Sequence, residues 1–249
     1  MKILFFGNSL LIALLNAYKR NNAILGPDVE CSFFIEIGGP GPGCTIEEDK
    51  IILSSRADKD KRPEVMVPAD LLDIPISQYD AVVFVALGRL HGMSLDKDVH
   101  IGSYGQMYEF GPKVNALTNI AISKSAYSEM VNYFTESQVG VSLMRSLKGY
   151  KFKRIVVEQP LLSDSIKDHP DWILRKLYDD PIAALNFFQT QRRITLTRIC
   201  EEEGVHFIPA LFDKEGFTPS HFSNEVDLFH TNHHYADLLF KEISQALAR

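Results

Sequence analysis

KILFFGNSLLIALLNAY, residues 2–18, is apolar on both sides of a short polar break, Gly7-Asn8-Ser9. Residues 3–6 form a continuous apolar run, which is typical of a strand buried on both faces of a sheet. After the break, apolar side chains return with the spacing of one helix face, at Leu11, Leu14, Leu15 and Tyr18. A secretion signal has an unbroken apolar run, so the break argues against that interpretation. We expect a buried strand, a tight turn and an amphipathic helix.

Hydrophobic patterns further along the chain alternate between strand and helix. Strands rich in Val, Ile and Phe are predicted at residues 30–37, 81–87, 154–158 and 206–208. Helices are predicted at residues 123–147, with a break at Gly140, at 181–203, and near the C-terminus with the stripe Ala236, Leu239, Phe240, Ile243 and Leu247. This alternation predicts an α/β fold with a mostly parallel sheet covered on both faces. Ligands bind such sheets at the carboxyl ends of the strands.

Two long segments interrupt this alternation. Residues 40–78 contain PGPG and the charged stretch RADKDKRPE, and we expect a hairpin or a surface excursion there. Residues 161–180, which include SDSIKDHPDW, are predicted to be a second long loop. Loops of this length in a compact domain are usually functional or mobile. Because no internal repeat or low-complexity linker occurs, residues 1–249 are predicted to form a single domain.

The composition argues against several classes of function. The chain has 249 residues, of which 45% are hydrophobic, so it can bury a sizeable core. Its formal net charge of −6 and its lack of a long basic run argue against nucleic acid or an anionic membrane as the main partner. No segment approaches the ~18 uninterrupted apolar residues of a membrane span. We expect a soluble, cytoplasmic protein.

The cysteines and glycines suggest no metal or nucleotide site. Cys31, Cys44 and Cys200 are odd in number and in no C-x-x-C pattern, which indicates neither a disulfide framework nor a thiolate zinc site. The run GGPGPG is no dinucleotide-binding loop, because Pro40 and Pro42 remove amide donors that would bind phosphate. A P-loop sequence is absent as well.

Ser9 stands in the turn after the first predicted strand, at the carboxyl edge of the predicted sheet. A serine there can be a nucleophile whose own backbone N–H helps to hold the oxyanion that forms. The alternative is a helix N-cap, a position that serine fills often. The turn alone favours the N-cap.

The C-terminal stretch NEVDLFHTNHHYADLLFKEI favours the nucleophile over the N-cap, because Asp227 and His230 precede the last predicted helix. At this spacing a carboxylate can hold the imidazole tautomer while the other ring nitrogen faces a serine. The loop before a final helix leaves the sheet edge that carries Ser9, so the two ends of the chain can meet there. Taken singly, Asp227 is a loop carboxylate or helix cap and His230 a partly buried histidine. Together with Ser9, they predict a catalytic site.

These two end blocks resemble the SGNH hydrolases, also called GDSL-like esterases and lipases. FFGNSL is similar to the family's first block, with Asn8 where the motif has aspartate and Ser9 at the nucleophile. DLFHTN is similar to its last block, which implies Asp227 as the acid and His230 as the base. The resemblance implies a flavodoxin-like three-layer α/β/α sandwich with a mostly parallel central sheet.

The middle blocks of the family match less well. The resemblance implies an oxyanion N–H at Gly38 or Gly39, beside that of Ser9. The third block lines up with VALGRLHG, where Gly88 stands at the family's glycine and Leu90 at its asparagine. Leucine cannot donate a hydrogen bond, and the loss of one oxyanion donor typically costs ~10²–10³ in turnover. Either His91 or another side chain supplies the missing oxyanion donor, or the site is slow, specialised or degenerate.

The resemblance implies ester hydrolysis by a Ser-His-Asp triad without a cofactor, on a small-molecule or carbohydrate ester, with an O-acetyl group on a carbohydrate as our first choice. The candidate substrate-binding residues are Asn8, His91 and Gln159, although for Gln159 an ordinary strand-ending turn is the simpler interpretation. One alternative is a non-hydrolytic binding protein, which Leu90 favours. Another is a metal-dependent hydrolase, because His230 and His234 are spaced to share one helix face, with Asp227 and His233 nearby as further metal ligands.

Overall fold

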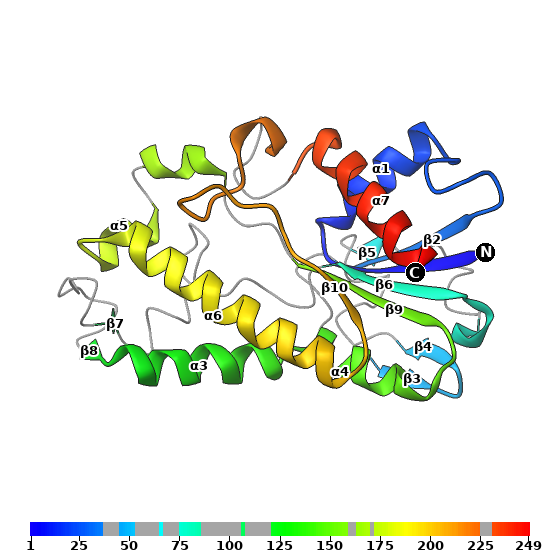
Figure 1. Cartoon of the computed structure of the whole chain (residues 1–249), viewed down its shortest axis with the longest axis horizontal. Helices are drawn as coiled ribbons and strands as arrows, with labels where there is room; N and C mark the ends of the chain where they lie inside the picture. The colour runs from blue at the N-terminus through cyan, green and yellow to red at the C-terminus, as the bar shows by residue number, and fades with distance from the viewer. Residues whose placement is uncertain are drawn as a thin grey trace.

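In this computed structural model the described residues are 1–36, 45–52, 65–66, 75–85, 106–107, 121–158, 163–169, 172–224 and 231–249 (Figure 1). Within them, six strands form one sheet in the order β10-β9-β6-β1-β2-β5. These strands are β1 (Lys2–Gly7), β2 (Glu30–Glu36), β5 (Val65–Met66), β6 (Ala81–Val85), β9 (Lys153–Val157) and β10 (His206–Ile208). Neighbouring strands pair in parallel except for β5, which is antiparallel to β2.

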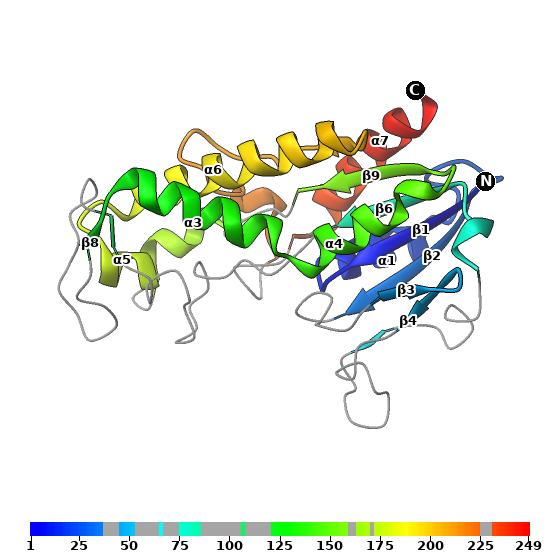
Figure 2. The same cartoon turned by 90° about the horizontal axis from the view of Figure 1, so that it is seen from below.

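Helices and two small strand pairs complete the described structure (Figure 2). The helices are α1 (Leu11–Arg20), α3 (Lys124–Glu136), α4 (Val139–Ser146), α5 (Ile173–Leu177), α6 (Pro181–Glu202) and α7 (His233–Ala248). Short 3-10 helices are η3 (Ile76–Gln78), η5 (Leu147–Gly149), η6 (Asp164–Asp168) and η7 (Ser220–Phe222). The small pairs are the antiparallel hairpin β3 (Thr45–Glu47) and β4 (Lys50–Ile52), and the parallel pair β7 (Gln106–Met107) and β8 (Ala121–Ile122).

The sheet has the flavodoxin-like strand order. Numbered along the chain without antiparallel β5, the described parallel strands lie in the spatial order 2-1-3-4-5. The predicted α/β sandwich with a mostly parallel central sheet is therefore confirmed. The helix that follows β1, α1, covers one face, whereas α4 covers the other. The adjacent carboxyl ends of β1 and β6 are thus the topological switch point, where ligands bind in such folds.

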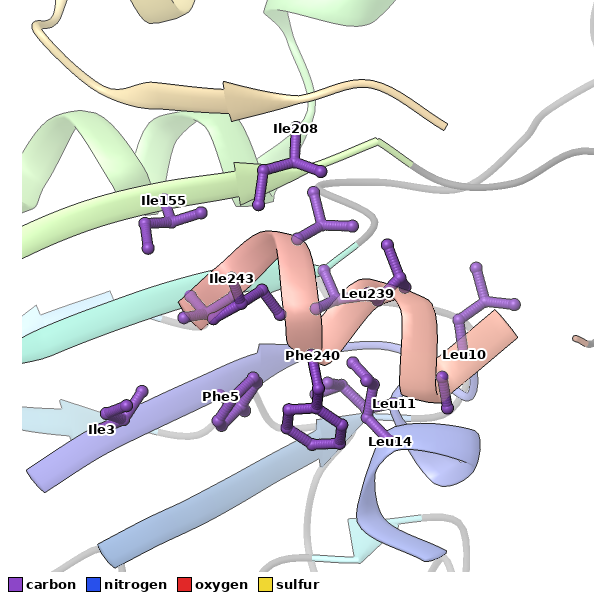
Figure 3. Packing of buried hydrophobic residues seen from close by; sticks show 14 of the residues in the cluster. Ile3, Phe5, Leu10, Leu11, Leu14, Ile155, Ile208, Leu239, Phe240 and Ile243 are labelled. Carbon is purple, nitrogen blue, oxygen red and sulfur yellow. The ribbon is translucent and has the colours of Figure 1, made fainter. Parts of the chain in front are cut away.

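Both faces of β1 are buried, as its uninterrupted apolar run predicts. Ile3 and Phe5 pack against α1 and α7, whereas Leu4 and Phe6 pack against α4 and the C-terminal half of α6. Figure 3 shows Phe240 of α7 directed toward the sheet beside Phe5, and the two ring centroids are 5.8 Å apart in an edge-to-face arrangement. Burial of apolar surface on both faces holds the three layers together.

The N-terminal half of α6 extends beyond the sheet and packs with α3 and α5 (Figures 1 and 2). Its apolar core is separate from the two sheet clusters, and within it Trp172 and Phe217 meet edge to face with ring centroids 5.9 Å apart. The prediction of one long loop at residues 161–180 is therefore wrong, because η6 and α5 form there. Buried Ile166, Trp172 and Leu177 drive this folding, since they find apolar partners on distant elements.

The predicted helix at residues 123–147 is two helices, and the break lies at Ser137 and Gln138 instead of Gly140. Ser137 Oγ and Gln138 Nε2 both donate to the carbonyl oxygen of Phe134, at 3.2 and 2.9 Å, and so close the last turn of α3. Gly140 is buried inside α4. In the segment 40–78, the described hairpin β3–β4 agrees with one of the two expectations.

No helix in the described part of the chain combines the length and apolarity that are needed to cross a membrane.

The replacement Gly7→Ala is expected to destabilise the sheet. A Cβ on Gly7 would lie 2.2 Å from the carbonyl oxygen of Val85, so β1 and β6 would have to separate. Overpacking a core typically costs about 1–3 kcal/mol, and we expect the upper end because the clash is with backbone. The free energy of unfolding from urea denaturation measures this loss. Gly149→Ala is the matched control, because a Cβ there meets no atom within 4 Å. Equal stability of the two variants would contradict this account.

Candidate active site

The turn after β1 is held by its own backbone and by Asn8. The Asn8 side chain is only 5% exposed, and its Oδ1 accepts a hydrogen bond from the N–H of Leu10 at 2.9 Å. The N–H groups of Leu11 and Ile12 donate to the carbonyl oxygens of Asn8 and Ser9, each at 3.0 Å. The first N–H groups of α1 are therefore used inside the turn, and Asn8 is a structural part of it.

Ser9 lies half-buried at the point where the chain leaves the sheet. The N-cap residue of α1 is Leu10, so Ser9 stands one residue before the position that the capping interpretation gave it. The N–H groups of residues 10–12 already donate hydrogen bonds within the turn, so an oxyanion held near Ser9 needs other donors. The expected donors are the N–H of Ser9 itself and those of Gly38, Gly39 and Gly88, and these three glycines lie outside the described residues.

A pocket of about 290 Å³ opens beside Ser9. One wall is the start of α1, and the opposite side is formed by Asn224 and Thr231. In the sequence, these two residues flank segment 225–230, which contains the predicted acid Asp227 and the predicted base His230. Asp227 and His230 lie outside the described residues. The described neighbours on both sides of that segment nevertheless line the same pocket as Ser9.

The two ends of segment 225–230 are tied together. Ser223 and Thr231 form an antiparallel β-bridge, and the N–H of Asn232 donates to the carbonyl oxygen of Phe222 at 2.8 Å. Tyr235, in the first turn of α7, is fully buried and packs edge to face on Phe222, with ring centroids 5.6 Å apart. Burial raises the pKa of the Tyr235 phenol above its usual range, so this side chain stays neutral.

Asn232 connects the two ends of segment 225–230, and this role was not predicted from the sequence. Its Nδ2 donates to the carbonyl oxygens of His221 and Ser223, at 2.8 and 3.0 Å. Its Oδ1 accepts from the N–H groups of His234 and Tyr235, at 3.0 and 3.3 Å, which caps α7. The signal that was available is an asparagine directly before a helical stripe, a preferred N-cap.

The other predicted site residues follow strands that end at the same edge. Gly7 is opposite Ile35 of β2 and Val85 of β6, and Val85 is opposite Val157 of β9. Parallel pairing therefore puts the carboxyl ends of all four strands side by side. In the sequence, Leu90 and the candidate substrate-binding residues His91 and Gln159 follow these strands, and all three are outside the described residues.

The metal hypothesis rests on a histidine cluster at the start of α7. His233 and His234 are exposed there, with ring centroids 3.9 Å apart. Among the described residues, no three His, Cys, Asp or Glu side chains are grouped so that they could hold a metal ion. Asp227 and His230, the other members of the proposed set, lie outside that part of the chain, so this hypothesis stays open.

Comparisons with known proteins add no family to this description. No protein-family model matches the chain, and no curated protein matches its sequence significantly.

The replacement Asn232→Asp separates the two hydrogen-bonding roles of this side chain, as a donor through Nδ2 and as the cap of α7 through Oδ1. It keeps an acceptor for the N–H groups of His234 and Tyr235, but it puts an oxygen where Nδ2 now donates to two carbonyl oxygens. We expect a loss of about 1–2 kcal/mol in the free energy of unfolding, in line with two broken hydrogen bonds. Amide hydrogen exchange at position 232 should become faster while the amides of His234 and Tyr235 remain protected.

The matched control for this experiment is Asn22→Asp, which makes the same change at an exposed position in the turn after α1. Unchanged exchange at position 232, or an equal effect of the control, would show that the Asn232 amide does not hold the two segments together.

Proposed function

We propose that this chain is a serine hydrolase of the SGNH type that cleaves an ester with Ser9 as its nucleophile. The observation that carries the proposal is the shared pocket: Ser9 lines it together with Asn224 and Thr231, the described residues on either side of segment 225–230. The position of Ser9, in the turn that follows β1 at the switch point, supports the same conclusion because this is the ligand-binding edge of a doubly wound sheet.

The proposed reaction is acyl transfer to water. His230 takes the proton of the Ser9 hydroxyl, Ser9 Oγ attacks the ester carbonyl, and Asp227 stabilises the imidazolium that forms. The N–H of Ser9, with that of Gly38 or Gly39, holds the negative charge of the tetrahedral intermediate. His230 then gives its proton to the leaving alcohol, and water repeats the attack to release the acid.

The proposed substrate is a small acyl ester on a polar alcohol, with an O-acetylated carbohydrate as the first choice. The pocket of about 290 Å³ lies near the lower end of the range for small-molecule sites, ~300–1,000 Å³. Asn16 and Asn224 line it beside Ser9, and amide side chains both donate to and accept from hydroxyl groups. An acyl group as small as acetyl, attached to a hydroxyl-rich alcohol, is compatible with this lining.

Labelling with a fluorophosphonate tests the nucleophile. We expect an adduct on Ser9, located by mass spectrometry, and its loss in Ser9→Ala without a change in stability. Ser142→Ala, on the exposed surface of α4, is the matched control and should label like the parent protein. Labelling retained in Ser9→Ala would remove Ser9 from the chemistry. No labelling, under conditions where a known serine esterase reacts, would favour the non-hydrolytic binding protein.

The pH dependence of labelling tests the base. A histidine base acts as the neutral imidazole, so the rate should rise with pH through a midpoint near the reference pKa of ~6.5. His230→Ala should lower the rate and remove this dependence. A flat profile from acid to neutral pH in the parent protein would contradict the role of His230. Loss of ester hydrolysis on chelation, with stoichiometric metal in the purified protein, would instead favour the metal-dependent mechanism.

A further inference from the structure

A second pocket, of about 500 Å³, lies between α6 and the segment 209–216. Among the described residues, those that line it are different from those that line the pocket at Ser9. One side is a single face of α6, with the helical spacing of Asn186, Gln189, Thr190, Arg193 and Ile194. The opposite side consists of Ala210, Leu211, Phe212, Asp213 and Gly216. Its volume is typical of a site for a small molecule.

Arg193 is held in one orientation in this pocket. Its Nε and Nη2 donate to Glu158, at 2.8 and 2.7 Å, and Nη2 also donates to the carbonyl oxygen of Ala210 at 2.8 Å. The guanidinium lies over the ring of Phe212, 4.6 Å from its centroid. These contacts leave Nη1 without a hydrogen-bond partner among the described residues. The pocket therefore presents a positioned donor whose positive charge Glu158 already balances.

The pocket also offers hydrogen-bond acceptors and amide groups, from Asp213 on the opposite side and from Gln189 and Asn186 on the same face of α6 as Arg193. Asp213 Oδ1 accepts from the N–H groups of Glu215 and Phe217, both at 2.9 Å, which leaves Oδ2 for a ligand. Gln189 donates its Nε2 to the carbonyl oxygen of Gly216, which leaves Oε1. The Asn186 amide has no hydrogen bond within the described part of the chain. The lining thus offers both donors and acceptors.

Gly216 keeps these amide groups within the pocket. Its φ is +85°, and a Cβ there would lie 2.1 Å from Asn186 Oδ1 and 2.8 Å from Gln189 Oε1. A residue with a side chain would push both amides away from the segment 209–216. The glycine therefore permits a close approach that the polar lining requires.

The rim of the pocket is apolar. Ile194 is 56% exposed and Leu211 is 41% exposed, and they are two of the five large apolar side chains that are exposed in the described part of the chain. Both belong to this pocket, so exposed aliphatic surface is concentrated beside the free polar groups. Exposed apolar surface next to converging polar groups is typical of a binding site.

We propose that this second pocket binds a neutral sugar residue. A pyranose ring has C–H faces that can cover Ile194 and Leu211, and hydroxyl groups that donate and accept at once. Asp213 Oδ2 and Gln189 Oε1 accept from those hydroxyls, and Arg193 Nη1 and the Asn186 amide donate to them. A free anion would be repelled by the Asp213 carboxylate, because Glu158 already balances the charge of Arg193. A cation without acceptor atoms would leave the Arg193 donor unused. The inference does not depend on the proposed hydrolase activity.

Oligosaccharide binding by the full-length chain tests this assignment. The probes are an immobilised panel of neutral oligosaccharides and the same panel with acidic sugars, followed by titration of the best neutral member in solution. We expect a neutral member to bind, and its resonance shifts in an NMR titration to fall at residues 186–194 and 210–216. Asn186→Ala should weaken binding at least tenfold, and Thr190→Trp, which fills the pocket, should abolish it.

Two controls separate this site from the site at Ser9. Asn22→Ala removes an exposed amide outside the pocket and should bind like the parent protein. Ser9→Ala should also bind normally, whether or not Ser9 is a nucleophile. The assignment is overturned if no neutral oligosaccharide binds, if acidic sugars are preferred, or if binding survives both Asn186→Ala and Thr190→Trp.

Discussion

The pairing of β1 between β2 and β6 is the constraint on which the rest of the structure depends. Gly7, the last residue of β1, is in register with Ile35 and Val85 of its two neighbours. Because a Cβ at this point would collide with the carbonyl oxygen of Val85, the strands can approach this closely only at a glycine. The chain turns out of the sheet directly afterwards, so a backbone contact determines where Ser9 stands.

Apolar burial on one face of β1 then brings two distant parts of the chain to that turn. Phe5 packs on Phe240 of α7 (Figure 3), and the same cluster includes Leu10 at the start of α1 and Tyr235 at the start of α7. The starts of both helices are therefore held against one sheet edge by nondirectional packing. Directional bonds from Asn8 and Asn232 fix the two turns that this packing has brought together.

The sequence reveals features whose signal is local and hides those that depend on distant partners. The strands could be predicted because residues 3–6 and 81–85 are continuous apolar runs. The turn at Ser9 could be predicted because glycine, asparagine and serine favour turns between apolar segments. Helix α5 and the 3-10 helix η6 were missed because Trp172, which lies between them, is buried against Phe217, far along the chain. Asn232 carries a local N-cap signal, but its bonds to the carbonyl oxygens of His221 and Ser223 require a closed loop that spacing does not reveal.

The second pocket has a structural support in Glu158, which follows β9 directly. This carboxylate is 2% exposed, and it accepts hydrogen bonds from Arg193 of α6 and from the N–H of Ala210 at 3.0 Å. A buried charge that loses its partner is strongly destabilising, so β9, α6 and the segment 209–216 must keep their mutual geometry. The N–H of Leu211, in that same segment, donates to Tyr235 Oη at 3.5 Å. The polar lining of the second pocket is therefore anchored to β9 by Glu158 and to the first turn of α7 by Tyr235, and α7 begins two residues after Thr231, which lines the pocket at Ser9.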